Sequence, residues 1–208
     1  MSKPVAKVLS TTPLENKDAK WVNLVEIKYE NIDGKIRRWE AAKRTTKPKG
    51  SLVDAVIIVA VLQKPTGPEL LLQKQFRPPL NNITIELPAG LVDPNETPEE
   101  CAVRELREET GYIGEAIPDR TGIRPVLFGA VGLSDSSSFM IHVKVDMEKS
   151  ENQNPKPQLE DGEFIECFTV PLKDLYSECR KLYSEGFAID GKVGSIAEGL
   201  EMSKLWHI

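Results

Sequence analysis

Alternating hydrophobic and polar positions near the start of the chain predict a β-hairpin. Residues 21–29 and 35–44 form two strand-like runs. The connecting residues Asn31-Ile32-Asp33-Gly34 end in Asp-Gly, which is a strong turn signal. More strand-like runs follow, and the apolar segment within residues 55–62 is typical of a buried strand. Strands are predicted over residues 52–62, 70–76, 83–87, 124–131, 139–145 and 164–170.

The signals for a central helix are clear at both of its ends. Thr97 is a suitable N-cap, Pro98 stands at the first helical position, and Glu100 completes a capping box. Gly111 is a typical residue to end the helix, which is therefore predicted over residues 98–110. Further helices are predicted over residues 172–184 and 194–205, after a long polar loop at residues 148–162. Strands around a central helix, followed by helices, predict an α/β fold in which a mixed sheet packs between helices.

The length of the chain favours one main domain with a small extension. A chain of 208 residues can bury a single sizeable core. We expect residues 1–50 to form an N-terminal β-hairpin extension and residues 51–208 to form the main domain.

Composition excludes several classes of protein. The net charge of −5 argues against a nucleic-acid-binding protein that works through bulk basicity, although a small anionic substrate stays possible. No apolar run is long enough for a membrane span, and the first residues do not resemble a secretion signal. Cys101, Cys167 and Cys179 show no paired spacing, so they are expected to be reduced thiols. A cytoplasmic protein is predicted, and a nuclear or organellar pool stays open.

The central helix carries a cluster of acids on one side. At 100° per residue, Glu105, Glu108 and Glu109 share a face, and Arg104 can pair with Glu108 one turn later. A separate face carries Ala102, Val103, Leu106 and Thr110. The remaining negative charge suits a hard divalent cation such as Mg²⁺. A solvated acidic face is the alternative, but the tight turn that leads into the helix favours a metal–pyrophosphate site.

The stretch from Gly90 to Tyr112 resembles the Nudix box, G-x5-E-x7-R-E-U-x-E-E-x-G-U, where U is a bulky apolar residue. The matching positions are Gly90, Glu96, Arg104, Glu105, Leu106, Glu108, Glu109 and Gly111. Tyr112 fills the last position with an aromatic residue instead of an aliphatic one. The resemblance implies the Nudix α/β/α sandwich and a pyrophosphohydrolase that acts on a nucleoside diphosphate linked to another group.

The same resemblance implies roles for the residues of the box. Mg²⁺, with Mn²⁺ as a possible substitute, would be bound by the Ala89 carbonyl and by glutamates. These glutamates are Glu105, Glu108, Glu109 and, on the later loop, Glu163. Arg104 would orient a glutamate. Glu163 would be a further metal ligand or the general base.

Segments outside the box are similar to one branch of the family, the ADP-ribose and other ADP-sugar pyrophosphatases. These segments are residues 39–46, 74–79, 86–93 and 162–164. The likeness implies that Trp21 and Trp39, one from each subunit of a homodimer, sandwich the adenine. Glu40 would accept from the adenine amino group, and Arg44 and Arg77 would hold phosphate or terminal-ribose oxygens. Without the likeness, ordinary hairpin packing is the favoured explanation of the two tryptophans, and surface salt bridges explain the two arginines equally well.

The sequence thus predicts Mg²⁺-dependent hydrolysis of ADP-ribose to AMP and ribose 5-phosphate. Two alternatives are another Nudix specificity, for GDP-sugars or oxidised nucleoside diphosphates, and a catalytically silent ADP-ribose-binding module. Residues 130–134 lack the proline of the Ser-Pro-Gly-like segment typical of the branch. The preference among ADP-sugars is therefore left open.

Overall fold

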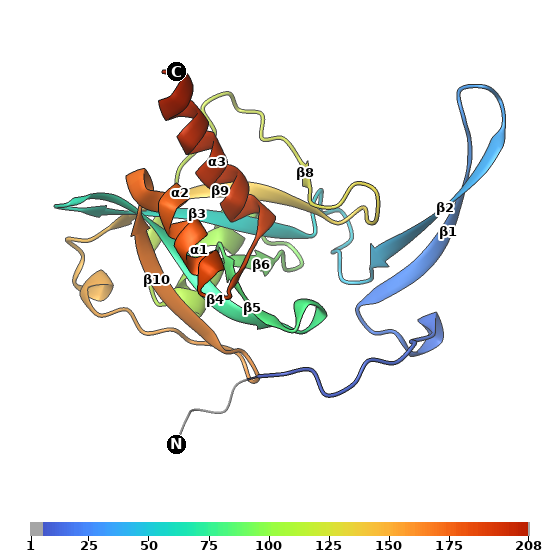
Figure 1. The fold of residues 1–208 in the computed structure, drawn as a ribbon, viewed down its shortest axis with the longest axis horizontal. Coiled ribbons are helices and arrows are strands. Elements are labelled where there is room, and N and C mark those ends of the chain that lie inside the picture. Colours follow the sequence, from blue (N-terminus) through green and yellow to red (C-terminus); the bar gives the residue numbers. More distant parts are fainter. Residues whose placement is uncertain (1–5, 208) are drawn as a thin grey trace.

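A nine-stranded mixed sheet forms the centre of the computed structural model, which describes residues 6–207 (Figure 1). Its longer strands are β3 (Ala55–Lys64), β4 (Gly67–Arg77), β5 (Asn82–Glu86), β9 (Ser137–Asp146) and β10 (Ile165–Pro171). Its short strands are β6 (Ala89–Leu91), β7 (Gly114–Ala116), β8 (Leu127–Phe128) and β11 (Ala188–Ile189). The main order is β11-β5-β4-β3-β9-β7, with β10 beside β4, β6 beside β3 and β8 beside β9. The pairs β3–β9 and β5–β11 are parallel and the other pairs are antiparallel.

Helices cover both faces of this sheet. In the view of Figure 1, α2 (Leu175–Ser184) and α3 (Gly191–Trp206) lie in front of the sheet and α1 (Pro98–Thr110) lies behind it. The buried side chains of β3 alternate accordingly, because Ile58 packs in the core with α1 and Ile57 packs in the core with α2 and α3. This arrangement confirms the predicted α/β/α sandwich with a mixed sheet. No helix of the described residues is long and apolar enough to cross a membrane.

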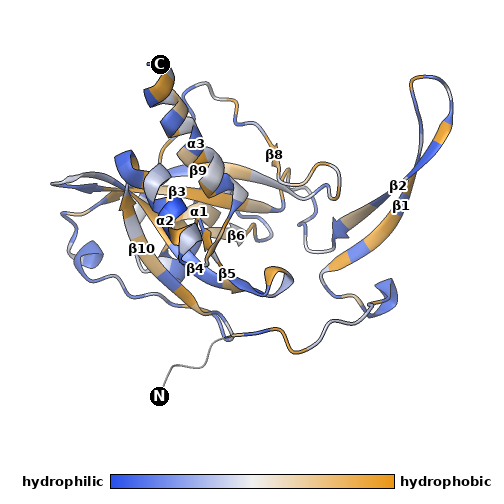
Figure 2. Cartoon of the chain, viewed as in Figure 1, coloured by the Kyte–Doolittle hydropathy of each residue, from blue (hydrophilic) through white to orange (hydrophobic). Residues whose placement is uncertain are grey.

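The N-terminal hairpin forms a sheet of its own. Strands β1 (Val22–Glu30) and β2 (Ile36–Arg44) pair antiparallel, and Gly34 adopts a positive φ of 75° in the turn between them. The hairpin stands away from the main body (Figure 1), and hydrophobic residues follow β1 (Figure 2). The predicted extension is therefore present, while the boundary between residues 1–50 and 51–208 stays a prediction.

Three predicted elements need correction. The strand expected over residues 124–131 is reduced to β8, because Pro125 lacks an amide donor and the exposed residues after Phe128 turn away from β9. Helix α3 begins at Gly191, three residues before its predicted start, because Asp190 caps it by accepting a hydrogen bond from the Lys192 amide at 2.9 Å. The short 3₁₀ segments are η1 (Asn16–Asp18), η2 (Pro78–Leu80), η3 (Ser150–Gln153) and η4 (Leu172–Asp174), so α2 also begins later than predicted.

Candidate active site

Local contacts fix both ends of α1, the helix that carries the acidic cluster. The Glu100 amide donates to the Thr97 hydroxyl at 3.2 Å, and the Thr97 amide donates to the Glu100 carboxylate at 2.8 Å. At the other end Gly111 adopts a positive φ of 76° and its amide donates to the Arg107 carbonyl at 2.8 Å. The predicted capping box and helix bounds are confirmed, and the acids therefore stand on a rigid support.

A glycine allows α1 to approach strand β6 closely. A Cβ atom added at Gly90 would lie 1.9 Å from Cδ of Glu105 and 2.0 Å from its Oε1. Any side chain at position 90 would displace the Glu105 carboxylate. The glycine thus places this carboxylate directly against the backbone of β6.

Arg104 links the carboxylates on the outer side of α1. Its guanidinium donates to Glu96 through Nε at 2.7 Å, to Glu105 through Nη1 at 2.8 Å and to Glu108 through Nη1 at 3.0 Å. A fourth bond, from Nη2 to the Leu91 carbonyl at 3.1 Å, ties the guanidinium to β6. The expected pairing of Arg104 with Glu108 is present. The guanidinium also lowers the pKa of Glu96, its principal partner.

The Glu109 side chain points into the protein. It is 6% exposed, and its Oε2 accepts the Ala89 amide at 3.0 Å while its Oε1 accepts Nε2 of Gln73 at 3.4 Å. Burial, with smaller contributions from the charges of Glu105 and Glu163, raises the pKa of Glu109 to about 8. Burial also raises the pKa of Glu105, although Arg104 opposes this effect. Among the described residues Glu109 therefore has no ion-pair partner, whereas Arg104 partly compensates the charge of Glu105.

Glu163 reaches this cluster from a separate loop. It follows Gly162, which adopts a positive φ of 88°, and it stands just before β10. Its Oε2 accepts the Glu160 amide at 3.1 Å. Its charge raises the pKa of both Glu105 and Glu109, so the three carboxylates lie within electrostatic reach of one another.

These residues fit a hard divalent cation. Carboxylate oxygens are the ligands that Mg²⁺ prefers, and buried carboxylates with raised pKa values need a positive charge. Within residues 6–207, however, no three acidic, histidine or cysteine side chains are already arranged around a common point. Two of the acids, Glu105 and Glu108, are held by Arg104 instead. A cation would therefore have to draw them partly away from the guanidinium.

The sheet beneath α1 surrounds the predicted Arg77 with further polar residues, of which Gln73 was not singled out from the sequence. Gln73 on β4 lies between Cys167 on β10 and Glu86 on β5 in one row of paired residues. Arg77 donates to both oxygens of Glu86, through Nε at 2.7 Å and Nη2 at 2.5 Å. Its pKa is raised, first by Glu86 and more weakly by charges that include Glu109. The break in the leucine run before Gln73 was the available signal for this row.

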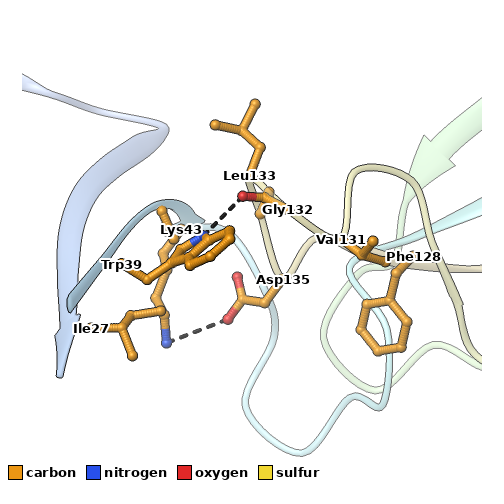
Figure 3. Close-up of a pocket in the computed structure, with 10 residues that line it drawn as sticks. Ile27, Trp39, Lys43, Phe128, Val131, Gly132, Leu133 and Asp135 are labelled. Carbon is orange, nitrogen blue, oxygen red and sulfur yellow. Dashed lines mark hydrogen bonds and ion pairs between the residues drawn. The ribbon is translucent and has the colours of Figure 1, made fainter. Parts of the chain in front are cut away.

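Trp39 lies at a different place, between the hairpin and the main body. Its indole Nε1 donates to the Gly132 carbonyl at 3.0 Å, and the backbone of Ala42 donates to the Leu133 carbonyl at 2.7 Å. Figure 3 shows Trp39 and Lys43 facing residues 131–135 of the main body. Lys43 and Asp135 form an ion pair at 3.4 Å. A cavity of about 300 Å³ lies between the hairpin and this segment.

A single chain does not bring the two predicted adenine-binding tryptophans together. Trp21 accepts the Thr45 amide at 3.1 Å, so it lies beside Thr45 at the open end of the hairpin. Trp39 lies on β2, six residues from Thr45. At the rise of a β-strand, six residues separate Trp39 from the position of Trp21 by roughly 20 Å. Glu40 and Arg44 are exposed on the same strand. The hairpin residues therefore form a group separate from the acidic cluster.

Comparisons with known proteins agree with this geometry. The family model described as the NUDIX domain matches residues 52–187. The chain is similar to an uncharacterized Nudix hydrolase of Schizosaccharomyces pombe, with 47% identity over 93% of this chain and 92% of the relative. It is 43% identical to an ADP-ribose pyrophosphatase of Saccharomyces cerevisiae, over 93% of this chain and 83% of that protein. It is 38% identical to an ADP-sugar pyrophosphatase of Mus musculus, over 85% of this chain and 79% of that protein.

Proposed function

The chain belongs to the Nudix family, and from this premise we propose that it is a divalent-cation-dependent ADP-sugar pyrophosphatase. ADP-ribose is the proposed main substrate, with AMP and ribose 5-phosphate as products. The observation that carries the proposal is the pair of carboxylates, Glu105 and Glu109, between α1 and β6. Burial raises the pKa of both, and among the described residues only Glu105 has an ion-pair partner, Arg104 at 2.8 Å. The names of the yeast and mouse relatives support the choice of substrate.

The acidic cluster would hold Mg²⁺, or Mn²⁺ as a substitute, through Glu105, Glu108, Glu109 and the Ala89 carbonyl. When bound, a divalent cation neutralises pyrophosphate charge and makes a water molecule more acidic. Glu109 must lose its proton to become a ligand, so cation binding and ionisation of this residue are linked. Arg104 would hold the outer carboxylates in place. Glu163, on its loop, would take a proton or add a further ligand.

The hairpin would supply the specificity for adenine. Trp39 is already oriented by the Gly132 carbonyl and would stack on one face of the base. Trp21 of the partner subunit would cover the other face, which requires a homodimer. Glu40 would accept from the adenine amino group, and Arg44 would bind phosphate or ribose oxygens. Arg77 would serve the same purpose from the sheet, where Glu86 fixes its guanidinium.

The cytoplasm is the compartment that we propose. Cys101, Cys167 and Cys179 are all free thiols. Burial raises the pKa of Cys167 to about 12, so this thiol is protonated and unreactive at neutral pH. Reduced, unreactive cysteines are typical of proteins that work in a reducing environment.

A substrate panel with the purified protein tests this function. ADP-ribose, a GDP-sugar and an oxidised nucleoside diphosphate are supplied with Mg²⁺, and released phosphate is measured after coupling to a phosphatase. We expect the highest kcat/KM for ADP-ribose, AMP as the nucleotide product, and loss of turnover in EDTA. A higher kcat/KM for either other substrate would establish a different specificity. Tight binding of ADP-ribose without any product over hours would indicate a silent binding module.

A further inference from the structure

One buried amide beside the acidic cluster has no role in the function proposed above. Gln73 lies on β4 with 1% of its side chain exposed, directly after the fully buried run Leu70–Leu72. A primary amide in such surroundings costs free energy unless it forms hydrogen bonds. The contacts of Gln73 therefore indicate why a polar side chain stands at this position.

Gln73 and the backbone of β6 hold the same carboxylate. Nε2 of Gln73 donates to Oε1 of Glu109 at 3.4 Å, near the outer limit of a hydrogen bond, while the Ala89 amide donates to Oε2 at 3.0 Å. One donor comes from β4 and the other from β6, so each carboxylate oxygen is held from a different strand. Together the two donors restrict rotation of the carboxylate plane.

The side chains beside Gln73 on the sheet form their hydrogen bonds with other groups. Both oxygens of Glu86, beside it on β5, accept from Arg77. Sγ of Cys167, beside it on β10, is directed to the Glu109 carbonyl at 3.6 Å. Within the described residues, the amide oxygen of Gln73 accepts no hydrogen bond at all.

Packing alone does not explain Gln73. A buried acceptor without a partner costs about 1–3 kcal/mol. A methionine has nearly the same length and would fill the space without that cost, because volume-conserving apolar side chains are well tolerated in cores. The presence of Gln73 at a position where it lowers stability is therefore best explained by its hydrogen bond to the Glu109 carboxylate.

We infer that Gln73 is a positioning residue of the cation site, whose amide orients the Glu109 carboxylate for binding a divalent cation. This inference rests on the proposed function, because it requires Glu109 to be a ligand. Groups that hydrogen-bond to metal ligands change metal affinity or activity by about 10- to 100-fold when they are removed.

Gln73→Met tests the inference, with Leu71→Met as the matched control. Leu71 is 1% exposed, lies two residues away on the same face of β4 and has an apolar side chain that cannot hydrogen-bond to a carboxylate. Mn²⁺ is titrated calorimetrically into each protein without substrate, and melting temperatures are measured in EDTA. We expect the Kd for Mn²⁺ to rise about 10-fold or more in Gln73→Met and to stay within twofold in Leu71→Met. The melting temperature of Gln73→Met in EDTA should not fall, which separates positioning from a structural role.

Further outcomes are equally decisive. A Kd for Mn²⁺ in Gln73→Met within twofold of the parent value overturns the inference. If this variant does not fold, Gln73→Val, a good strand former, is measured in its place and judged by the same criterion. A parent protein that binds Mn²⁺ but hydrolyses no ADP-ribose contradicts the proposed function alone. A parent protein that binds no Mn²⁺ contradicts both.

Discussion

Glu109 combines burial with a charge that the proposed reaction needs. Its pKa is raised, mainly by burial, from 4.5 to about 8. Between these two pH values the folded protein retains a proton on Glu109 that the unfolded chain has already lost. The stability from this proton is fully present below about pH 4.5 and is lost as the pH rises through about 8. Glu105 has a raised pKa for the same reason and adds to the effect.

The pH dependence of stability gives the first prediction. In EDTA the melting temperature should fall by several degrees between about pH 6 and about pH 9, since ~1 kcal/mol corresponds to about 2–4 °C for a chain of this size. Glu109→Gln cannot ionise, so this variant should lose less stability over the same range. Scanning calorimetry of both proteins measures the difference. Parallel curves for the parent and the variant would contradict the raised pKa.

The same substitution has a separate effect on turnover. Glu109→Gln keeps the hydrogen bond from Ala89 but removes the negative charge that a cation needs. We expect kcat with ADP-ribose and Mg²⁺ to fall by more than the roughly 100-fold typical of residues that only support a ligand. Circular dichroism should show an intact fold. Near-normal activity that still depends on Mg²⁺ would refute a ligand role for Glu109.

Gly90 offers a test of the close approach between α1 and β6. In Gly90→Ala the new methyl group would coincide with the Glu105 carboxylate, which must move aside. We expect turnover to fall by about 100-fold, as a shift of about 1 Å in a catalytic group can cause. The matched control is Gly199→Ala on the exposed face of α3, where no atom lies within 4 Å. That variant should keep full activity and gain about 0.5–1 kcal/mol of stability.

Helix α1 depends on its N-terminal cap as well as on its buried face. Thr97→Ala removes the hydroxyl that accepts the Glu100 amide. We expect a loss of about 1 kcal/mol of unfolding free energy, seen as a lower midpoint in urea with an unchanged slope. Ser195→Ala on α3 is the control, because its hydroxyl bonds only to the Gly191 carbonyl within the helix. If both variants lost a similar amount of unfolding free energy, the Thr97 cap would stabilise the protein no more than an ordinary helix hydroxyl does.

The contrast between α1 and β8 shows which elements the sequence could predict. The bounds of α1 follow from Thr97 and Gly111, which act on their immediate neighbours, so a single sequence is sufficient. The run at 124–131 looks equally strand-like, but a strand also needs a partner edge, and only two of its residues pair with β9. Pairing between distant segments is not encoded locally.

The same limit applies to the candidate active site. The pairing of Arg104 with Glu108 was predictable because the two residues are one helical turn apart. The contact between Gln73 and Glu109 depends on how β4 lies under α1, and the bond from Trp39 to Gly132 joins residues 93 positions apart. These contacts emerge only from the tertiary structure.

At the scale of the whole molecule, the hairpin leaves apolar side chains uncovered. Trp21 is 57% exposed, Leu24 61% and Trp39 50%, on an element that stands away from the main body (Figures 1 and 2). Exposed apolar patches of this kind usually mark an interaction surface. The separation of the two tryptophans within one chain agrees with our proposal that a second copy completes each adenine site.

Subunit complementation tests this assembly. Trp21→Ala and Trp39→Ala should each raise KM for ADP-ribose, because each removes one stacking face from every site. When the two variants are co-expressed with different tags and purified as a heterodimer, one site carries both alanines and the other carries both tryptophans. The heterodimer should therefore recover about half of the parent activity at low substrate concentration, since a twofold interface generates two equivalent sites. Each variant homodimer serves as the control, and it should show no such recovery. Failure of the two tagged chains to co-purify, or a heterodimer no more active than either homodimer, would refute the shared site.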